Sequence, residues 1–250
     1  MTLRVQQEPA WLLHHRPFRD SSRILDLLCR DHGRVSVVAR GARSAKSRLR
    51  GILRPFLPLS VSWVSRTDLG TLTGAEMNGA PLSLTGDALL SGYYINELLL
   101  KLTHRHDPQP ELFSAYARTV RHLAASLSVA VTLRQFEMEL LRLLGYALNL
   151  EHDSERRELL PGEQYYEYRA EQGAVPVSRA DGPMVFSGHE LLAIRNQGFS
   201  NPETLRSATR LLRGVIDFHL DGRELNSRKV LHDLRAAGRN ARQGREETTL

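Results

Sequence analysis

The feature of this sequence with the clearest chemical meaning is a run of basic residues that no acidic residue interrupts. No Asp or Glu occurs between Asp31 and Asp68, whereas eight cations do. Arginine can fork onto phosphate oxygens, lysine adds a mobile point charge, and Gly41 and Gly51 let the backbone approach a ligand closely. Such a surface fits a polyanion, and nucleic acid is the commonest one in a cell. The residues that we predict to contact DNA are Arg34, Arg40, Arg43, Lys46, Arg48 and Arg50.

The alternative is a solvated charged loop, and aromatic residues that could stack on bases are sparse around it. Phe18 and Phe56 are the better candidates for stacking, although each also fits a core position, and Trp63 lies on an apolar strand face. Sparse aromatics favour sequence-independent binding led by the phosphate backbone. If about six cations meet phosphates, log affinity for a single strand should fall against log salt with a slope of about −4.

Residues that could hold a metal or perform catalysis are few. The segment His104–Asp107 reads HRHD, but it falls at a predicted helix end, where His and Arg favour the helix dipole. Cys29 lies in an apolar run and fits a small core residue. No GxxxxGK[ST] loop and no Gly-x-Ser-x-Gly elbow occurs. We therefore predict no catalytic residue, no metal and no cofactor. A metal-dependent nuclease that uses His104, His106 and Asp107 is the enzyme alternative.

The net charge of +6 is distributed unevenly along the chain. Residues 1–80 hold 13 Lys and Arg against 6 Asp and Glu, a net charge of +7, whereas residues 81–250 hold 21 against 22, a net charge of −1. This asymmetry predicts a polyanion-binding module followed by a neutral scaffold. With one cysteine, no signal peptide and no apolar run of the ~20 residues that span a bilayer, we predict a cytoplasmic protein without a membrane partner. The predicted DNA contacts would make it nucleoid-associated.

Residues 1–80 must position the basic run, and they read as short strands separated by turns. Within residues 57–63, apolar residues alternate with serine or proline at a period of two, as in a strand with one buried face. Five short strands in about 80 residues fit an OB-type barrel, although the pattern alone leaves an SH3-like barrel open. The predicted strands are Ala10–Arg16, Arg23–Cys29, Arg34–Arg40, Arg54–Val64 and Gly70–Met77.

The apolar period then becomes helical, which predicts a mainly α-helical domain over residues 81–236. The first three helices are expected from a cap at Asp87 to about His104, from Pro110, and from a cap at Thr132 to about Gly145. Later helices are expected after Ser187, which with Glu190 has capping-box spacing, from Asn201, and over Ser227–Ala236.

Residues 151–187 interrupt the helical pattern and are predicted to form a small irregular insertion. They contain a possible β-hairpin, Tyr165–Arg169 with Ala174–Val177, around Gly173. The polar residues 237–250 are predicted to be a disordered tail. The expected fold class is therefore α+β: an N-terminal OB-fold barrel over residues 1–80 followed by a helical domain with a hairpin insertion.

Four segments follow one another in a familiar order along nearly the whole chain. They are Leu12–Leu59, Leu89–Leu102 (LLSGYYINELLLKL), Leu133–Leu150 (LRQFEMELLRLLGYALNL) and His219–Leu231 (HLDGRELNSRKVL). Together they resemble the RecO family of bacterial recombination mediators. The resemblance implies binding of single- and double-stranded DNA, strand annealing, and partnership with single-strand-binding protein and RecR, with RecF and RecA as indirect partners in recombinase loading. An RNA-binding OB-fold protein is the alternative from another class.

The same resemblance implies a second site, for the acidic, phenylalanine-ended tail of single-strand-binding protein. Such a tail needs an apolar slot for its ring and cations for its carboxylates. The predicted tail-binding residues are Arg134, Met138 and Leu141, at helical spacings of four and three, and Arg206 and Arg210, four apart on a later helix. Taken without the resemblance, Met138 and Leu141 would be core residues and the arginines surface residues.

One departure from the family concerns residues 151–187. Many RecO proteins carry a four-cysteine zinc site near this place, and this segment has no cysteine. His152 and His189 are two isolated imidazoles, which do not make a closed tetrahedral site. We therefore predict that this segment binds no zinc and is held by its own apolar residues. Those residues include Tyr165, Tyr166 and Val175.

Overall fold

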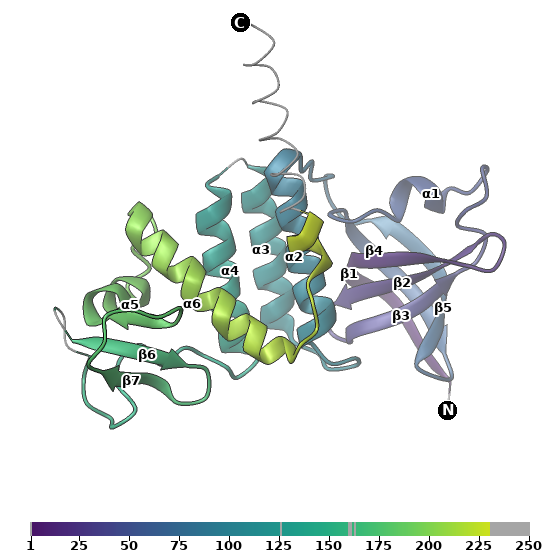
Figure 1. The fold of residues 1–250 in the computed structure, drawn as a ribbon. Helices are drawn as coiled ribbons and strands as arrows, with labels where there is room; N and C mark the ends of the chain where they lie inside the picture. Colours follow the sequence, from purple (N-terminus) through teal and green to yellow (C-terminus); the bar gives the residue numbers. More distant parts are fainter. Residues whose placement is uncertain (1, 126, 160–161, 163, 231–250) are drawn as a thin grey trace, which may run out of the picture.

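The N-terminal part of the chain is a closed barrel of five strands. The structure is a computed structural model that describes residues 2–125, 127–159, 162 and 164–230. The strands are β1 (Leu3–Phe18), β2 (Ser22–Cys29), β3 (Gly33–Ala39), β4 (Pro58–Ser65) and β5 (Leu69–Met77). Their order around the barrel is β1-β2-β3-β5-β4, with β3 and β5 parallel and the other pairs antiparallel (Figure 1). This closed arrangement confirms the OB-type barrel and sets the SH3-like alternative aside.

Two strand boundaries differ from the prediction for local reasons. β1 begins at Leu3 rather than Ala10, because a register shift between Val5 and Glu8 lets one long strand bend and pair with both β2 and β4. β4 begins at Pro58 rather than Arg54. The residues before it form a turn in which Phe56 has a φ of 62°, a left-handed conformation that a strand does not contain.

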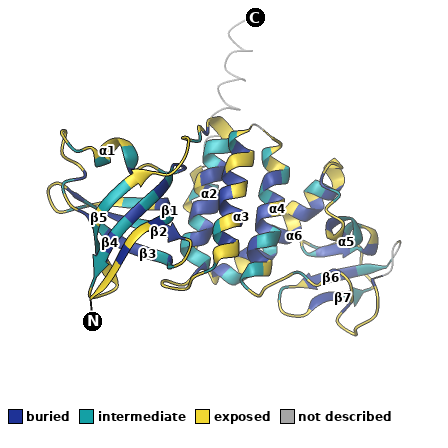
Figure 2. Cartoon of the chain, turned by 180° about the vertical axis from the view of Figure 1, so that it is seen from behind, coloured by how far each residue is buried: buried dark blue, intermediate teal, exposed yellow. Residues whose placement is uncertain are grey.

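The remainder of the chain is built from helices around a second core. The helices are α2 (Gly86–Leu102), α3 (Pro110–Ala124), α4 (Val129–Leu143), α5 (Gly188–Arg195) and α6 (Pro202–Leu220), while the short α1 (Leu49–Ile52) lies between β3 and β4. α2, α3 and α4 stand side by side, and α6 crosses them (Figure 1). Buried residues lie on α2 to α6 (Figure 2), and they pack into one hydrophobic cluster. This arrangement confirms the predicted α+β fold. None of the described helices is long and apolar enough to cross a bilayer.

The helix starts test the predicted caps. Pro110 opens α3, and the Ser187–Glu190 capping box is present at α5, as predicted. α2 instead has Thr85 as its N-cap, so that Asp87 lies in the first turn. The predicted cap Thr132 is wrong: α4 starts at Val129, and Thr132 donates its backbone N–H to the carbonyl of Ser128, 2.9 Å away, inside the first turn.

The insertion contains the predicted hairpin, formed by β6 (Tyr165–Arg169) and β7 (Gly173–Val177), and a third strand that the pattern did not reveal, β8 (Val185–Ser187). Tyr166 is buried as expected, but Tyr165 and Val175 are only half-buried. Tyr168 and Phe186 fill the small core instead. The predicted last helix is seen as helix over residues 226–230. The rest of Ser227–Ala236 and the predicted disordered tail, 237–250, lie outside the described residues.

One face of the barrel packs into the hydrophobic core of the helical part, while the barrel interior has a core of its own. The Trp11 ring on β1 meets the Tyr116 ring on α3 edge to face, with ring centroids 5.5 Å apart. The amide of Asn96 on α2 donates to the carbonyl of Leu13, 2.9 Å away, and the Tyr116 hydroxyl donates to the Asn96 side-chain oxygen at 2.7 Å. The proposed division into residues 1–80 and 81–236 therefore separates units that are packed together, so experiments on function should use the full chain.

Gly33 allows the loop between α2 and α3 to dock on the barrel, which leads to a stability prediction. Its φ is +64°, and a Cβ at this position would overlap the backbone of Asp107. Gly41 has a φ of +66° but nothing within 4 Å of the same position, so it is a matched control. We expect Gly33→Ala to lower the free energy of unfolding by about 3 kcal/mol and Gly41→Ala by about 1 kcal/mol, measured by urea unfolding. Equal losses of unfolding free energy in the two variants would show that the overlap with Asp107 costs nothing beyond the strain of a positive φ.

Candidate nucleic-acid and peptide interfaces

Five of the six predicted DNA-contacting residues lie on one exposed loop, residues 40–54, which we call the basic loop. It connects β3 to β4, and α1 with the loop before it lies at the end of the barrel away from the helices (Figure 1). Its exposed cations are Arg40, Arg43, Lys46, Arg48, Arg50 and Arg54. Within the part of the chain that the structure describes, none of them forms an ion pair with a carboxylate. Their positive charge is therefore available to an external anion.

The backbone of the basic loop is ordered by its own hydrogen bonds. Ala42 and Leu53 are buried in the barrel and anchor the two ends of the loop. Between them, the backbone N–H of Ser44 donates to Gly41 at 3.1 Å, that of Ser47 to Ser44 at 3.0 Å, and that of Arg50 to Ser47 at 3.2 Å. Successive turns thus hold the cations on a defined surface, which reduces the entropy lost when they contact phosphates.

The turn between β1 and β2 lies against the basic loop and adds a cation that sequence reasoning missed. The Arg43 backbone N–H donates to the carbonyl of Ser21 at 2.8 Å, and the Arg43 guanidinium lies 3.4 Å from the carbonyl of Arg19. Arg19 is exposed and lies over the Phe18 ring, 5.2 Å from its centroid. The β1–β2 loop is one of the nucleic-acid-binding loops of OB folds, so the predicted fold could have pointed to Arg19.

Arg34 is not part of this surface. It lies at the opposite end of β3 from Arg40, about 20 Å away for an extended strand of this length. Its guanidinium is half-buried and donates to the Thr103 carbonyl at 2.8 Å and to the Thr103 hydroxyl at 3.2 Å. Burial, followed by the charge of Arg105, lowers the pKa of Arg34. In this structure, Arg34 ties the barrel to the end of α2.

The two candidate stacking residues differ in exposure. Phe56 is 4% exposed and packs against Tyr93, with ring centroids 5.3 Å apart, so that it offers no free face to a base. Phe18 is half-buried at the end of β1 beside Arg19. Trp63 is buried in the barrel, as predicted, and so is Cys29. Backbone-led binding thus remains the expectation for this surface.

The predicted HRHD segment follows α2 and is also used for docking. The backbone N–H of His106 donates to the carbonyl of Arg34, 3.0 Å away, and the Arg105 guanidinium lies 3.9 Å from the Asp26 carboxylate. Among the described residues, no group of three or more His, Cys, Asp or Glu side chains is placed to hold a metal ion.

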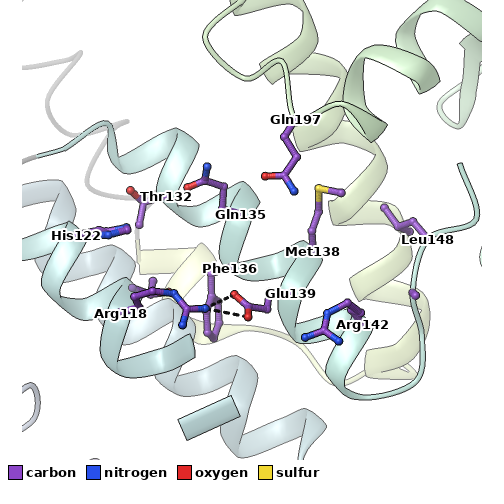
Figure 3. A pocket seen from close by; sticks show the side chains of 12 residues that line it. Arg118, His122, Thr132, Gln135, Phe136, Met138, Glu139, Arg142, Leu148 and Gln197 are labelled. Carbon is purple, nitrogen blue, oxygen red and sulfur yellow. Dashed lines mark hydrogen bonds and ion pairs between the residues drawn. The ribbon is translucent and has the colours of Figure 1, made fainter. Parts of the chain in front are cut away.

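In the helical part, a pocket of about 420 Å³ lies between α3, α4 and the segment after α5 (Figure 3). Phe136, Met138 and Leu148 supply its apolar lining. At its edge, one guanidinium nitrogen of Arg118 on α3 donates to both carboxylate oxygens of Glu139, at 2.9 and 2.8 Å. Of the predicted tail-binding residues, Met138 lines this pocket, whereas Leu141 is fully buried in the core.

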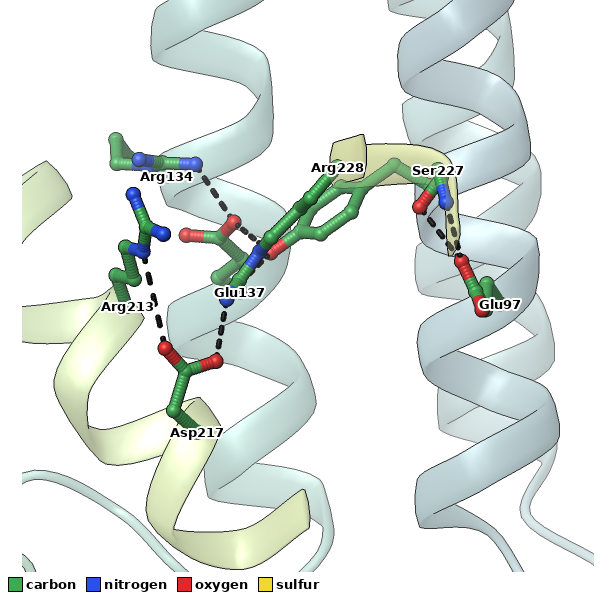
Figure 4. A network of polar contacts seen from close by, with 8 residues as sticks. Glu97, Arg134, Glu137, Arg213, Asp217, Ser227 and Arg228 are labelled. Carbon is green, nitrogen blue, oxygen red and sulfur yellow. Dashed lines mark hydrogen bonds and ion pairs between the residues drawn. The ribbon is translucent and has the colours of Figure 1, made fainter. Parts of the chain in front are cut away.

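Arg134 lies on a neighbouring face of α4 and takes part in a buried polar network (Figure 4). It is 9% exposed and donates to Glu137 at 2.6 Å, while the Tyr94 hydroxyl donates to the same carboxylate oxygen at 2.7 Å. Burial raises the pKa of Glu137, and the charge of Arg134 opposes that effect. Arg134 Nε and Glu137 Oε2 are buried and have no hydrogen-bond partner among the described residues.

Two further arginines extend this network to the surface. Arg228 donates to the Tyr94 hydroxyl at 3.3 Å and pairs with Asp217 of α6, and Arg213 Nε lies 3.7 Å from the same carboxylate. Figure 4 shows Arg134 directed at Glu137, and Arg213 and Arg228 directed at Asp217. We call Arg134, Arg213 and Arg228 the arginine cluster. Arg213 is three residues after the predicted Arg210, whereas no pattern pointed to Arg228.

The other two predicted tail-binding arginines lie elsewhere on α6. Arg206 is exposed and lies 3.8 Å from Glu203, one turn earlier on the same helix. Arg210 lies 3.4 Å from Glu190 and above the Phe186 ring, 4.1 Å from its centroid. The structure therefore brings neither of them into the network around Arg134.

The segment after α6, residues 221–230, returns across α2 and carries Arg228 to the cluster; we call it the C-terminal strap. Glu97 of α2 holds it by accepting from the backbone N–H groups of Asn226 and Ser227, at 2.9 and 2.8 Å, and from the Ser227 hydroxyl at 2.7 Å. Burial alone would raise the pKa of Glu97, but the hydrogen bonds from Ser227 and Asn226 outweigh it, so that the pKa lies below the usual glutamate value.

This lowered pKa predicts an acid-sensitive strap. The carboxylate form is favoured in the folded protein, so its contribution is present above the usual glutamate pKa and is lost as pH falls through the lower folded value. We expect Glu97→Gln to lower the free energy of unfolding by about 1–2 kcal/mol at neutral pH. In urea unfolding experiments, the difference in free energy of unfolding between the variant and wild type should become smaller from neutral to acidic pH. A constant difference across that range would contradict the assignment.

Comparisons with known proteins cover both parts of the structure. The family model for recombination protein O N terminal matches residues 1–80, and that for recombination protein O C terminal matches residues 83–229. The DNA repair protein RecO of Azoarcus sp. (strain BH72) is 45% identical over 235 residues, which cover 92% of this chain and 97% of that protein. The DNA repair protein RecO of Methylococcus capsulatus (strain Bath) is 41% identical, over 91% of this chain and 93% of that protein. The one of Coxiella burnetii (strain CbuG_Q212) is 42% identical, over 92% of this chain and 100% of that protein.

Proposed function

The chain belongs to the recombination protein O (RecO) family, and from this premise we propose that it binds single- and double-stranded DNA through the basic loop and anneals complementary strands. The observation that carries the proposal is the set of exposed cations on this loop that pair with no described carboxylate. Arg40, Arg43, Lys46, Arg48 and Arg50 stay in the proposed site and Arg19 joins it. Arg34 contributes by holding the barrel against the helices.

Annealing needs no covalent chemistry on this account. Two complementary strands repel one another through their phosphates, and cations that neutralise phosphates on both strands lower that repulsion. An ordered loop with six exposed cations supplies such neutralisation without a nucleotide or a metal. We therefore propose a DNA-binding and annealing protein rather than an enzyme, acting in DNA repair and recombination.

We further propose that the helical part receives the acidic, phenylalanine-ended tail of single-strand-binding protein. The arginine cluster would bind the carboxylates of the tail. The aromatic ring would enter the neighbouring apolar pocket, which Met138 lines one helical turn after Arg134. Leu141 packs in the core behind this face of α4. Arg213 and Arg228 replace the predicted Arg206 and Arg210 as the proposed contacts. RecR, with RecF and RecA as indirect partners, remains an expectation from the family.

The test is strand annealing with bare strands and with strands coated by single-strand-binding protein. The proposal predicts that the full chain accelerates annealing in both cases, without nucleotide. Competition between single-stranded DNA and RNA of equal length tests the RNA-binding alternative, which predicts preference for RNA. Incubation of DNA with Mg²⁺ or Mn²⁺ tests the nuclease alternative through cleavage. No acceleration of annealing on bare strands would overturn the DNA-binding proposal.

A further inference from the structure

The arginine cluster already holds a carboxylate of the chain itself. Asp217 on α6 pairs with Arg228 and lies 3.7 Å from Arg213 Nε. Its side chain is 48% exposed, whereas the other carboxylate of the network, Glu137, is 1% exposed. Asp217 is therefore the carboxylate at the open edge of the cluster, where an external carboxylate would arrive (Figure 4).

We propose that Asp217 is an internal competitor, which occupies the arginine cluster in the free protein and which an acidic peptide must displace. This inference rests on the proposed binding of an acidic tail. It adds a residue that sets the affinity and selectivity of that site, because the free energy of breaking the Asp217 contacts is subtracted from the free energy of peptide binding.

The contacts of the two carboxylates differ in the way this role requires. Glu137 is fixed by Arg134 and the Tyr94 hydroxyl in the core and cannot leave without exposing buried groups. Asp217 pairs with Arg213 at an exposed position, where ion pairs contribute little, and with the partly buried Arg228. A ligand with several carboxylates can replace both contacts at once, whereas a monovalent anion can replace only one of them.

A second observation is that one buried donor of the cluster has no acceptor in the free protein. The Arg134 side chain is 11% exposed, and its buried Nε has no acceptor among the described residues. An unpaired buried donor on a charged group costs stability, and an acceptor brought by a ligand would recover that cost. Asp217 does not serve this donor, so a peptide carboxylate toward which the Arg134 side chain turns would gain an interaction that the internal carboxylate lacks.

The experiment measures binding of a short fluorescent peptide of aspartates ending in phenylalanine to the full-length protein. We expect Asp217→Asn to bind it about fivefold more tightly than wild type, because an ion pair is no longer broken and a like charge is removed. Asp217→Glu, which keeps the charge, should bind like wild type. Asp221→Asn is the matched control, since Asp221 is exposed at the end of α6 with no described ion pair and its φ of 49° suits asparagine.

The outcomes separate this inference from the proposed function. If Asp217→Asn and Asp221→Asn both bind the peptide with wild-type affinity, Asp217 is not a competitor although the site stands. If Asp217→Asn binds more weakly, Asp217 supports the site and the inference is overturned. If neither wild type nor Asp217→Asn binds the peptide at low salt, the proposed tail site itself fails. Unfolding midpoints of all variants establish that each is folded.

Discussion

Replacing Arg43, Lys46 and Arg48 together by alanine is expected to weaken binding of single-stranded DNA by about 100-fold at low salt. Each cation that meets a phosphate releases condensed counterions, and three of about six contacts would be lost. The side chains are exposed and pair with no described carboxylate, so the variant should keep wild-type stability. Fluorescence anisotropy with a labelled oligonucleotide measures the affinity, and the salt slope should fall by about half.

A variant with the same loss of charge elsewhere serves as the control. Arg121, Arg156 and Arg195 are exposed, pair with no described carboxylate and lie in the helical part. Their triple replacement by alanine should leave DNA affinity within about twofold of wild type, because the lost charge lies outside the proposed interface. If the two triple variants lose equal affinity, net charge rather than the basic loop governs binding.

The second large effect concerns the buried ion pair. Arg134→Ala is expected to lower the free energy of unfolding by about 3 kcal/mol, because it leaves the Glu137 carboxylate, 1% exposed, without its cation. Burial already raises the pKa of Glu137, and removing Arg134 would raise it further. The folded variant then binds a proton more readily than the unfolded chain, so the loss of stability should shrink as pH falls. Urea unfolding at several pH values checks both statements.

A double variant separates stability from recognition. In Arg134→Met/Glu137→Gln neither charge remains, and the glutamine oxygen can still accept from the Tyr94 hydroxyl. We expect most of the stability to return, while affinity for the acidic peptide stays about tenfold below wild type and annealing of coated strands stays slow. A folded double variant that anneals coated strands as well as wild type would place the tail-binding site elsewhere.

Much of the fold could be predicted because local patterns and tertiary structure agree in it. The period-two alternation around Val61 and the turn glycines located the barrel strands, and Pro110 and the Ser187–Glu190 pair located two helix starts. The prediction was wrong where tertiary pairing decides. The first residues of β1 are largely polar, and they form a strand because they pair with β4 across a bulge. Thr132 has a residue type that is common at helix caps, but it lies inside α4.

The candidate sites were predicted less completely, for two physical reasons. The uninterrupted run of positive charge grouped Arg34 with Arg40 in one predicted site, but a strand about 20 Å long separates them in space. Conversely, Arg228 reaches Tyr94 only because the C-terminal strap folds back onto α2, and that return depends on Glu97. No local spacing encodes such a contact, so the arginine cluster could be recognised only in part, through Arg134.

The most direct test of the account is the salt dependence of DNA binding by the full-length protein. With a single-stranded oligonucleotide, we expect log affinity to fall linearly with log salt at a slope of about −4, because about six cations contact phosphates. A slope near zero would show that the cations of the basic loop do not meet phosphates, and so would the absence of binding even at very low salt.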